Sequence, residues 1–194
     1  MKRLDSSFYE QPTLELARSL LGHYLVHHHL GGQIVGKIVE TEAYLGAIDR
    51  AAHSFGGRRT NRTEVMFGLP GHVYTYQMHT HTLLNVVSGP VGTPEAVLIR
   101  AIEPIKGQAI IDMNRPGLKR FDQTNGPGKL TKALGITMDL YGHSLQHEPL
   151  YIVEGDVIPD IEAGPRVGIP NTGEARDYPY RFFERANPYV SKFR

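Results

Sequence analysis

Two glutamates and a tyrosine alternate at the end of one β-rich segment, in a pattern suited to acid–base chemistry. Glu40, Glu42 and Tyr44 follow Ile34 and Ile38 at even spacings. Because side chains of a strand alternate between its faces, these residues share one face unless a bulge intervenes. A carboxylate beside an aromatic ring suits general-base work, and two carboxylates also suggest glycoside hydrolysis. The alternative is an edge strand whose acids point to solvent.

Aromatic rings and imidazoles follow in a second segment. Tyr74 and Tyr76 share one strand face and suit a core, an interface or a platform for a planar ligand. His79 and His81 form a His-x-His pair that could hold zinc with Glu42, and His53 could complete the site. The run His27–His29 alternates between faces and is a weaker candidate. Because the chain has no cysteine, a metal would need histidines and carboxylates alone.

One glycine-rich segment could meet a phosphate. Gly126–Lys129 is too short to wrap phosphates as a Walker loop, and no Gly-x-Ser-x-Gly motif supports a serine hydrolase. The segment could still open a helix whose backbone N–H groups and Lys129 side chain face one phosphate. A plain turn is the alternative.

Charge is segregated along the chain although it sums to +1. Four arginines and no acid lie within residues 50–63, whereas six acids and no Lys or Arg lie within residues 133–165. Such segregation lets a nearly neutral protein present one basic face to a polyanion. Scattered, solvated charge is the other interpretation.

A mainly antiparallel sheet is needed to position these residues. Helical spacing followed by Gly22 predicts a helix over Pro12–Leu21, and Gly31-Gly32 predicts a hairpin turn. We predict an α+β fold, with a single mixed domain over residues 1–194. The predicted strands are His23–Leu30, Gln33–Tyr44, His72–Met78, Leu83–Ser88, Ala96–Ile102, Tyr151–Val153, Arg166–Ile169 and Tyr180–Phe183, and the further helices are Ile105–Asn114 and Gly128–Leu134.

Length and composition favour one ordinary globular domain. The chain has 194 residues, of which 40% are hydrophobic and 21% charged, and a chain of this size can bury a real core. No apolar run approaches the roughly 18 residues that span a bilayer, and the first residues lack the apolar core of a signal peptide. We therefore expect a soluble, cytoplasmic protein that does not enter membranes.

Seven blocks of the sequence resemble, in order and at matching spacing, those of alkyladenine DNA glycosylase, the 3-methyladenine glycosylase of animals and many bacteria. The resemblance implies a curved mixed domain with a protruding hairpin that enters the DNA minor groove. It also implies hydrolysis of the N-glycosidic bond of flipped-out alkylated or deaminated purines, namely 3-methyladenine, 7-methylguanine, hypoxanthine and ethenoadenine, without a metal or cofactor. The blocks are Val39–Gly46, Ala51–Ser54, Arg58–Phe67, Pro70–Tyr76, Leu98–Pro104, Gly126–Leu130 and Pro165–Ile169.

The resemblance implies a catalytic role for three of these residues. Glu42 matches the general base that activates a water, and Arg100 and the backbone carbonyl of Val167 match the groups that hold this water. Glycosylases with lyase activity attack with an amine instead. The only lysine within ten positions of Glu42 is Lys37, which alternation places on the opposite strand face. We therefore expect hydrolysis without a lyase step.

The resemblance also implies a base pocket. Tyr44 and His53 match the residues on one side of the flipped base, and Tyr76 matches the ring on the other side. The main-chain N–H of His53 would donate to the purine 6-position, and Asn85 would crowd the 2-amino group of guanine. Glu40 has no catalytic counterpart in the family, so we expect it to be structural.

The sequence departs from the family pattern after the Tyr-x-Tyr strand. The family usually has Tyr-Gly there, whereas this chain has Met78-His79-Thr80-His81. The wedge that fills the gap left by the flipped nucleotide is His79, which aligns best, or Met78. We expect a monomer that binds double-stranded DNA containing damaged purines, and a catalytically silent DNA-binding module is the alternative. The residues expected at the DNA backbone are Arg58, Arg59, Arg62 and Lys129.

Overall fold

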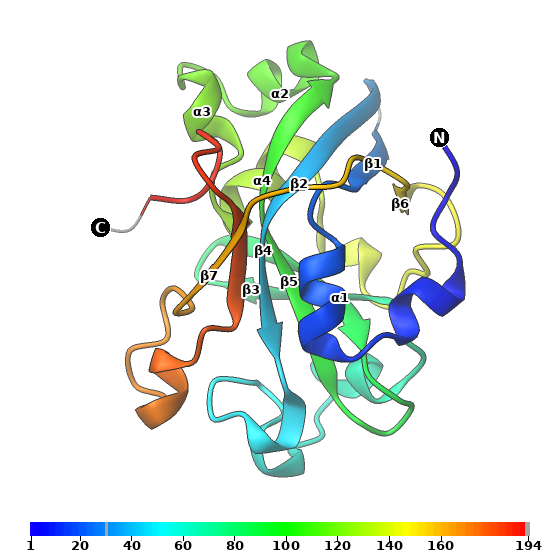
Figure 1. Cartoon of the computed structure of the whole chain (residues 1–194). Coiled ribbons are helices and arrows are strands. Elements are labelled where there is room, and N and C mark those ends of the chain that lie inside the picture. Colours follow the sequence, from blue (N-terminus) through cyan, green and yellow to red (C-terminus); the bar gives the residue numbers. More distant parts are fainter. Residues whose placement is uncertain (30, 193–194) are drawn as a thin grey trace.

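A single antiparallel sheet forms the frame of the molecule (Figure 1). The computed structural model describes residues 1–29 and 31–192. The strand order is β3-β4-β5-β2-β1-β6, and β8 pairs with both β2 and β7. This arrangement confirms the predicted α+β class. The strands are β1 (Tyr24–His29), β2 (Gly32–Tyr44), β3 (Val73–Met78), β4 (His81–Ser88), β5 (Glu95–Lys106), β6 (Leu150–Val153), β7 (Ile161–Gly164) and β8 (Arg181–Glu184).

Short helices pack against this sheet and connect its strands. Helix α1 lies against β2 and β5, and α4 lies against β4 and β5. Among the described residues, no helix is long and apolar enough to cross a membrane. The α-helices are α1 (Thr13–Ser19), α2 (Gln108–Asn114), α3 (Arg120–Gln123) and α4 (Pro127–Leu134), and the 3-10 helices are Ser6–Glu10, Gly46–Ile48, Phe55–Gly57, Glu64–Phe67, Met138–Leu140 and Gly173–Asp177.

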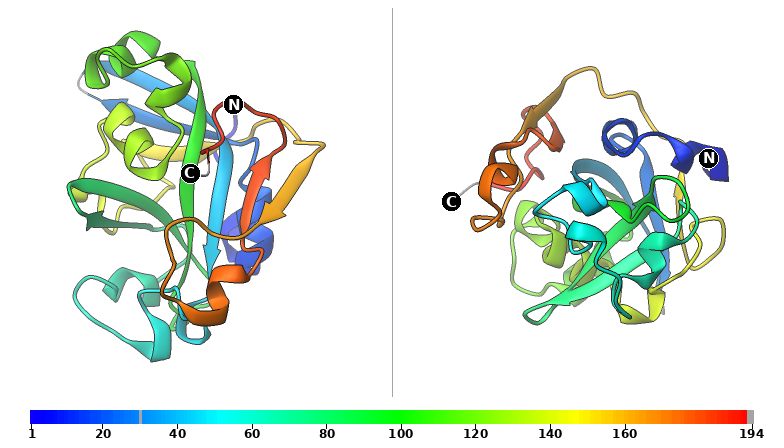
Figure 2. Two further views of the ribbon diagram at one scale, coloured as in Figure 1. Left: turned by 90° about the vertical axis from the view of Figure 1, so that its left-hand side faces the viewer. Right: turned by 90° about the horizontal axis from the view of Figure 1, so that it is seen from below.

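The sheet separates a hydrophobic core from a cavity. On β5, Val97 and Ile99 belong to the main core, which also contains residues of α1, α2 and α4. Ala96, Leu98 and Arg100 alternate with them and line a cavity on the other face. Period-two alternation thus lets one strand serve both the core and the site. Two views at right angles show how the sheet curls (Figure 2).

An irregularity in the β2–β5 ladder decides where the glutamates of β2 lie. Ile34 and Ile38 belong to the main core, and so does Ala43, although its number has the other parity. The β2–β5 register shifts between Ile38 and Glu40 and again between Glu40 and Thr41. A bulge of this kind inserts an unpaired residue and changes which face the following side chains take. The expectation that Ile34, Ile38, Glu40, Glu42 and Tyr44 share one face is therefore wrong.

The same irregularity corrects the predicted position of Lys37. Alternation from Ile38, which is in the core, places Lys37 on the side that carries Glu42 beyond the bulge. Its ammonium nitrogen lies 2.9 Å from the Glu103 carboxylate and 3.2 Å from that of Glu184. Lys37 is thus held by two acids of neighbouring strands.

Other predicted elements differ in their ends or in kind. Residues 166–169 form no strand, because the backbone there leaves the sheet and Gly168 has a φ of 78°. The helix predicted from Ile105 begins at Gln108, since β5 continues through Lys106 and Gly107 turns the chain with a φ of 86°. Gly32 pairs with His29, so the β1–β2 turn is one residue earlier than predicted, and residue 30 lies outside the described residues.

Strands β3 and β4 form a hairpin at one edge of the sheet (Figure 2). Met78 pairs with His81, which leaves His79 and Thr80 as a two-residue turn. His79 has a φ of 54°, the left-handed conformation that such tight turns require. The exposed apex therefore carries His79.

Candidate active site

A cavity of about 170 Å³ opens on the sheet face opposite the main core. Eight of the residues singled out from the sequence line it, although they come from four strands and two loops. They are Tyr44, His53, Tyr74, Tyr76, Met78, Asn85, Arg100 and Val167.

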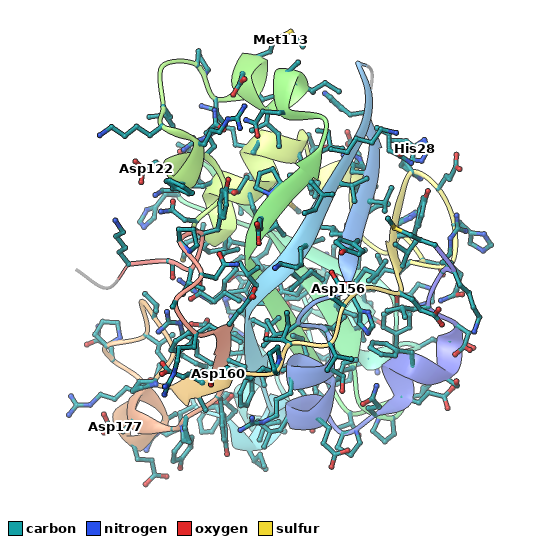
Figure 3. The ribbon with its side chains drawn as sticks, turned by 45° about the horizontal axis from the view of Figure 1, so that its top comes forward. His28, Met113, Asp122, Asp156, Asp160 and Asp177 are labelled. Carbon is teal, nitrogen blue, oxygen red and sulfur yellow. The ribbon has the colours of Figure 1, made fainter. Side chains whose placement is uncertain are left out.

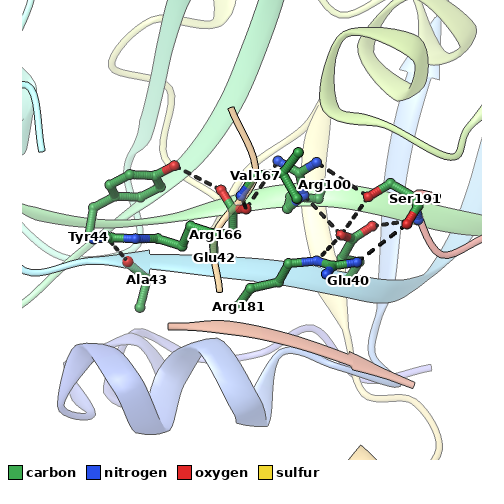
Figure 4. Close-up of polar contacts among 9 residues, drawn as sticks. All are labelled: Glu40, Glu42, Ala43, Tyr44, Arg100, Arg166, Val167, Arg181 and Ser191. Atoms are coloured by element: carbon green, nitrogen blue, oxygen red, sulfur yellow. Dashed lines mark hydrogen bonds and ion pairs between the residues drawn. The ribbon is translucent and has the colours of Figure 1, made fainter. Parts of the chain in front are cut away.

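Glu42 is fully buried and does not itself line this cavity. One carboxylate oxygen, Oε1, accepts a 2.7 Å hydrogen bond from the Val167 backbone N–H and lies 3.2 Å from Arg100 Nη1. The other oxygen, Oε2, accepts a 2.8 Å hydrogen bond from the Tyr44 hydroxyl (Figure 4). All three donors line the cavity. Oε1 therefore has two donors and Oε2 has one, which leaves Oε2 with more capacity to accept a proton.

The Tyr44 hydroxyl remains a donor. Burial and the adjacent Glu42 carboxylate raise the pKa of Tyr44 well above its ordinary value. The phenol stays protonated at any physiological pH and keeps its hydrogen bond to Glu42.

Three aromatic rings that line the cavity contact one another. The rings of Tyr74 and Tyr76 are stacked with centroids 5.5 Å apart, so they share a face as predicted. The His53 ring meets Tyr76 edge to face at 4.5 Å, and its Nδ1 lies 2.8 Å from the Tyr74 hydroxyl. Burial, together with the nearby positive charges of Arg62 and Arg58, lowers the pKa of His53 to about 4. The imidazole is therefore neutral at pH 7.

Asn85 lies at the back of the cavity, opposite Tyr74 in the β3–β4 ladder. Its side-chain amide donates a 3.0 Å hydrogen bond to the Tyr74 carbonyl, and the side chain is buried. This bond fixes the amide in the cavity wall.

An ion pair that we did not predict joins the two loops of the cavity. Arg166 Nη2 lies 2.8 Å from Asp49 Oδ1, and the Arg166 guanidinium carbon lies 4.7 Å from the centre of the Tyr44 ring. Asp49 also accepts bonds from the backbone N–H groups of Leu45 and Ala51. The pair therefore ties the loop that follows Tyr44 to the loop that carries Val167. Arg166 stands in a block of the resemblance, but only the fold reveals its partner.

A second buried network surrounds Glu40, which we expected to be merely structural. Its Oε1 accepts bonds of 2.9 Å from Arg100 Nε and 2.5 Å from Arg181 Nε. Ser191 adds its hydroxyl at 2.7 Å and its backbone N–H at 2.8 Å (Figure 4). The positive charges of Arg100 and Arg181 hold the pKa of Glu40 below its ordinary value, although burial alone would raise it. Arg181 and Ser191 are site residues that sequence reasoning missed.

The candidate DNA-backbone residues lie outside this cavity. Arg58 and Arg62 are exposed on the loop that follows His53. Arg59 is exposed too, and its Nε lies 2.9 Å from a Glu64 carboxylate oxygen. Lys129 is half-buried in the first turn of α4, where its ammonium group donates a 2.7 Å bond to the Asn125 side chain.

The described residues form no group of three His, Asp or Glu side chains that could hold a metal ion. The zinc interpretation of His79 and His81 therefore has no ligand set in this part of the chain. His27 stacks on His29 at 5.8 Å, and its Nδ1 lies 2.9 Å from the Leu134 carbonyl. Those two histidines pack against other residues of the protein.

The candidate wedge residues occupy different places. Met78 lines the cavity and is 46% exposed, whereas His79 lies at the apex of the hairpin turn. Met78 therefore borders the mouth of the cavity, and His79 lies beyond it.

Comparison with known proteins links this geometry to one family. The sequence profile of the methylpurine-DNA glycosylase family matches residues 7–188. A protein of Bacillus licheniformis named "Putative 3-methyladenine DNA glycosylase" is 60% identical over 97% of this chain and 96% of its own length. A protein of the same name from Bacillus subtilis is 58% identical over 97% of this chain and 96% of its own length. Another from Bacillus velezensis is 56% identical over 98% of this chain and 97% of its own length.

Proposed function

The chain belongs to the methylpurine-DNA glycosylase family, and from this membership we propose that it removes damaged purines from DNA by hydrolysis, with Glu42 as the base that activates water. It is a DNA-3-methyladenine glycosylase, an enzyme of DNA base-excision repair. The observation that carries the mechanism is the position of Glu42, which is buried and contacted by three donors that line an aromatic cavity.

The proposed base acts through Oε2, which has the Tyr44 hydroxyl as its one donor. A water that donates to Oε2 loses its proton as its oxygen attacks C1′ of the flipped deoxyribose. Arg100 and the Val167 carbonyl orient that water. The C1′–N bond breaks, its electron pair leaves with the purine, and the ionised carboxylate stabilises the positive charge that develops on the sugar.

The rings of the cavity account for the grip on a flipped base. Rotating a base out of the duplex costs a few kcal/mol, and each aromatic ring that it stacks on returns about 1–3 kcal/mol. Tyr44 and Tyr76 supply this stacking. The backbone N–H of His53 donates to a 6-oxo or alkylated purine, and Asn85 crowds the 2-amino group of guanine. We propose that 3-methyladenine, 7-methylguanine, hypoxanthine and ethenoadenine are substrates.

Replacement of Glu42 tests this mechanism directly. Glu42→Gln preserves the shape of the side chain but removes the base, so lesion binding should persist while excision is abolished. The measurement is single-turnover release of hypoxanthine or ethenoadenine from a labelled duplex. Excision by the variant within about threefold of the wild-type rate would exclude Glu42 as the base.

Glu103→Gln is the matched control. Glu103 is a carboxylate of the same sheet that pairs with Lys37 and does not line the cavity. Its replacement should leave the excision rate within about twofold of wild type, because it contacts none of the proposed catalytic groups.

The reaction should need neither a metal nor an amine nucleophile. Excision should persist in excess EDTA and phenanthroline, and borohydride should trap no covalent adduct with DNA, because hydrolysis forms no imine. Loss of activity to a chelator, with recovery on adding zinc, would instead support a histidine site.

A further inference from the structure

The guanidinium of Arg100 is shared between two carboxylates and one hydroxyl. Nε donates to Glu40 at 2.9 Å, Nη1 lies 3.2 Å from Glu42 Oε1, and Nη2 donates to the Ser191 hydroxyl at 3.3 Å. The Arg100 side chain is 6% exposed and both glutamates are 0% exposed. Solvent therefore does not compete for these bonds.

We propose that Glu40 and Ser191 are positioning residues that hold the Nε–Nη2 edge of Arg100 and thereby keep Nη1 at Glu42 Oε1. This inference rests on the proposed function and extends it to residues for which sequence reasoning found no catalytic role. Ser191 also lies beyond the residues 7–188 that match the family profile.

This hold matters because a free guanidinium prefers to bind a carboxylate through two parallel hydrogen bonds. If the Nε–Nη2 edge turned to Glu42, two such bonds would engage both of its oxygens, including Oε2, which the proposed mechanism needs for water. Glu40 and Ser191 occupy the edge of the guanidinium formed by Nε and Nη2, and the structure places Nη1 at Glu42 Oε1. Arg100 then orients the water without closing off the base.

Glu40 is itself held from three directions. Arg181 Nε lies 2.5 Å from Oε1, and Ser191 donates to Oε1 through its hydroxyl and to Oε2 through its backbone N–H. The Ser191 carbonyl accepts from Arg181 Nη2 at 3.3 Å. Tyr189, two residues earlier, packs on Val39 and Ala101 at the bulge and anchors this segment. The segment around Ser191 therefore completes the support of Arg100.

Two variants test the positioning role. Glu40→Gln removes the charge that holds Nε, and the single-turnover excision rate at saturating enzyme should fall about 100-fold, as expected for a misplaced catalytic group. Ser191→Ala removes only the hydroxyl and should slow excision about tenfold, the usual effect of one hydrogen bond to a charged group. Affinity for a lesion duplex should remain within about twofold in both, since neither residue lines the cavity.

A double-mutant cycle distinguishes positioning from general damage to the fold. In an Arg100→Ala background, Glu40→Gln should cause little further loss, because its effect passes through Arg100. Ser191→Thr retains a hydroxyl and should restore most of the rate lost in Ser191→Ala. Where Glu40→Gln does not fold, the Ser191 pair decides the question alone.

The outcomes separate this inference from the function on which it rests. If the wild type excises hypoxanthine and Glu42→Gln does not, but Glu40→Gln and Ser191→Ala retain wild-type rates, the positioning role is wrong and the glycosylase mechanism stands. The positioning role would also be wrong if Glu40→Gln lowered the excision rate by the same factor in the wild-type and Arg100→Ala backgrounds. If the wild type releases no purine from any lesion duplex, both proposals fail.

Discussion

A neutral histidine in the cavity makes a prediction about pH. Burial and two nearby arginines lower the pKa of His53 from 6.5 to about 4. Between these values the unfolded chain binds a proton that the folded protein does not, so stability should fall as pH decreases from 6.5 toward 4. NMR titration of the His53 ring should give a midpoint near 4, and a midpoint at 6.5 or above would contradict the buried, neutral state.

A variant isolates the contribution of this residue to stability. His53→Gln removes the titrating ring. The free energy of unfolding should therefore decrease less between pH 6.5 and pH 4 than in the wild type, by an amount on the order of 1–3 kcal/mol. Urea unfolding at several pH values between 4 and 7 measures it. His72→Gln, which changes an imidazole outside the cavity lining, is the control and should leave the slope unchanged.

Residue types and motif spacing identified the cavity well, but not its supports. Glu42, Tyr44, His53 and Tyr76 stand in short blocks whose order carries the resemblance, and the structure brings them to one place. Glu40 was expected to be structural because the resemblance gives it no catalytic counterpart, and its partners cannot be seen in the sequence. Its contact with Ser191 spans 151 residues, and no local pattern indicates such a pairing.

At the scale of elements, the β3–β4 hairpin places the two candidate wedge residues, Met78 and His79, in different positions. Met78 borders the cavity, so Met78→Ala should weaken the hold on a flipped base in every DNA context. His79 lies at the apex, so its loss should reduce flipping from a stable base pair but matter little opposite a gap, where less unstacking is required.

His79→Gly is the appropriate variant for this test. The φ of 54° at His79 suits glycine, whereas alanine would add backbone strain. Fluorescence of a base analogue beside the lesion, followed during binding, reports flipping for both variants. Equal effects in paired and gapped duplexes would show that His79 is not the wedge, and unchanged flipping in the double variant would direct attention to His81.

The sheet itself could be predicted from apolar periodicity, except where its geometry is irregular. Strands β1 to β5 have nearly the predicted ranges because alternation and turn residues mark them locally. The sequence of β2 gives no indication of the bulge near Glu40, because the bulge depends on how β2 pairs with β5. The segment after Pro165 reads as a strand by composition, but the Val167 N–H bonds Glu42 and not a neighbouring strand.

At the scale of the whole molecule, charge is divided between two sides. Arg58 and Arg62 lie close enough to His53 to lower its pKa, so positive charge flanks the cavity. Asp156 and Asp160 belong to the acidic segment, residues 133–165, and are exposed on the side that also carries α1 (Figure 3). The alternation in β5 and β2 places α1 and the cavity on opposite faces of the sheet.

This division predicts how salt affects DNA binding. Replacing Arg58 or Arg62 with Gln should weaken binding to any duplex and reduce the slope of log K against log salt by about 1 for each phosphate that is no longer neutralised. Lys2→Gln is the control, because Lys2 pairs with Glu154 of the acidic segment. Fluorescence anisotropy over a range of salt concentrations gives the slopes, and identical slopes for all three variants would place the DNA elsewhere.

The bulge in β2 constrains how this sequence can change over evolutionary time. Its register shifts place Ile38 and Ala43 in the core while Tyr44 lines the cavity and Glu42 contacts residues that line it. Substitution of Val39 by another apolar residue alters only local packing. Deletion of that same residue, with Ile38 still paired to Ile102 and a regular ladder beyond it, would move Thr41 and every later residue of β2 by one position along β5, so that Glu42 would lie opposite Ile99 instead of Leu98. Across descendants of this gene, the number of residues between Gly36 and Glu42 should therefore be inherited more strictly than their identities.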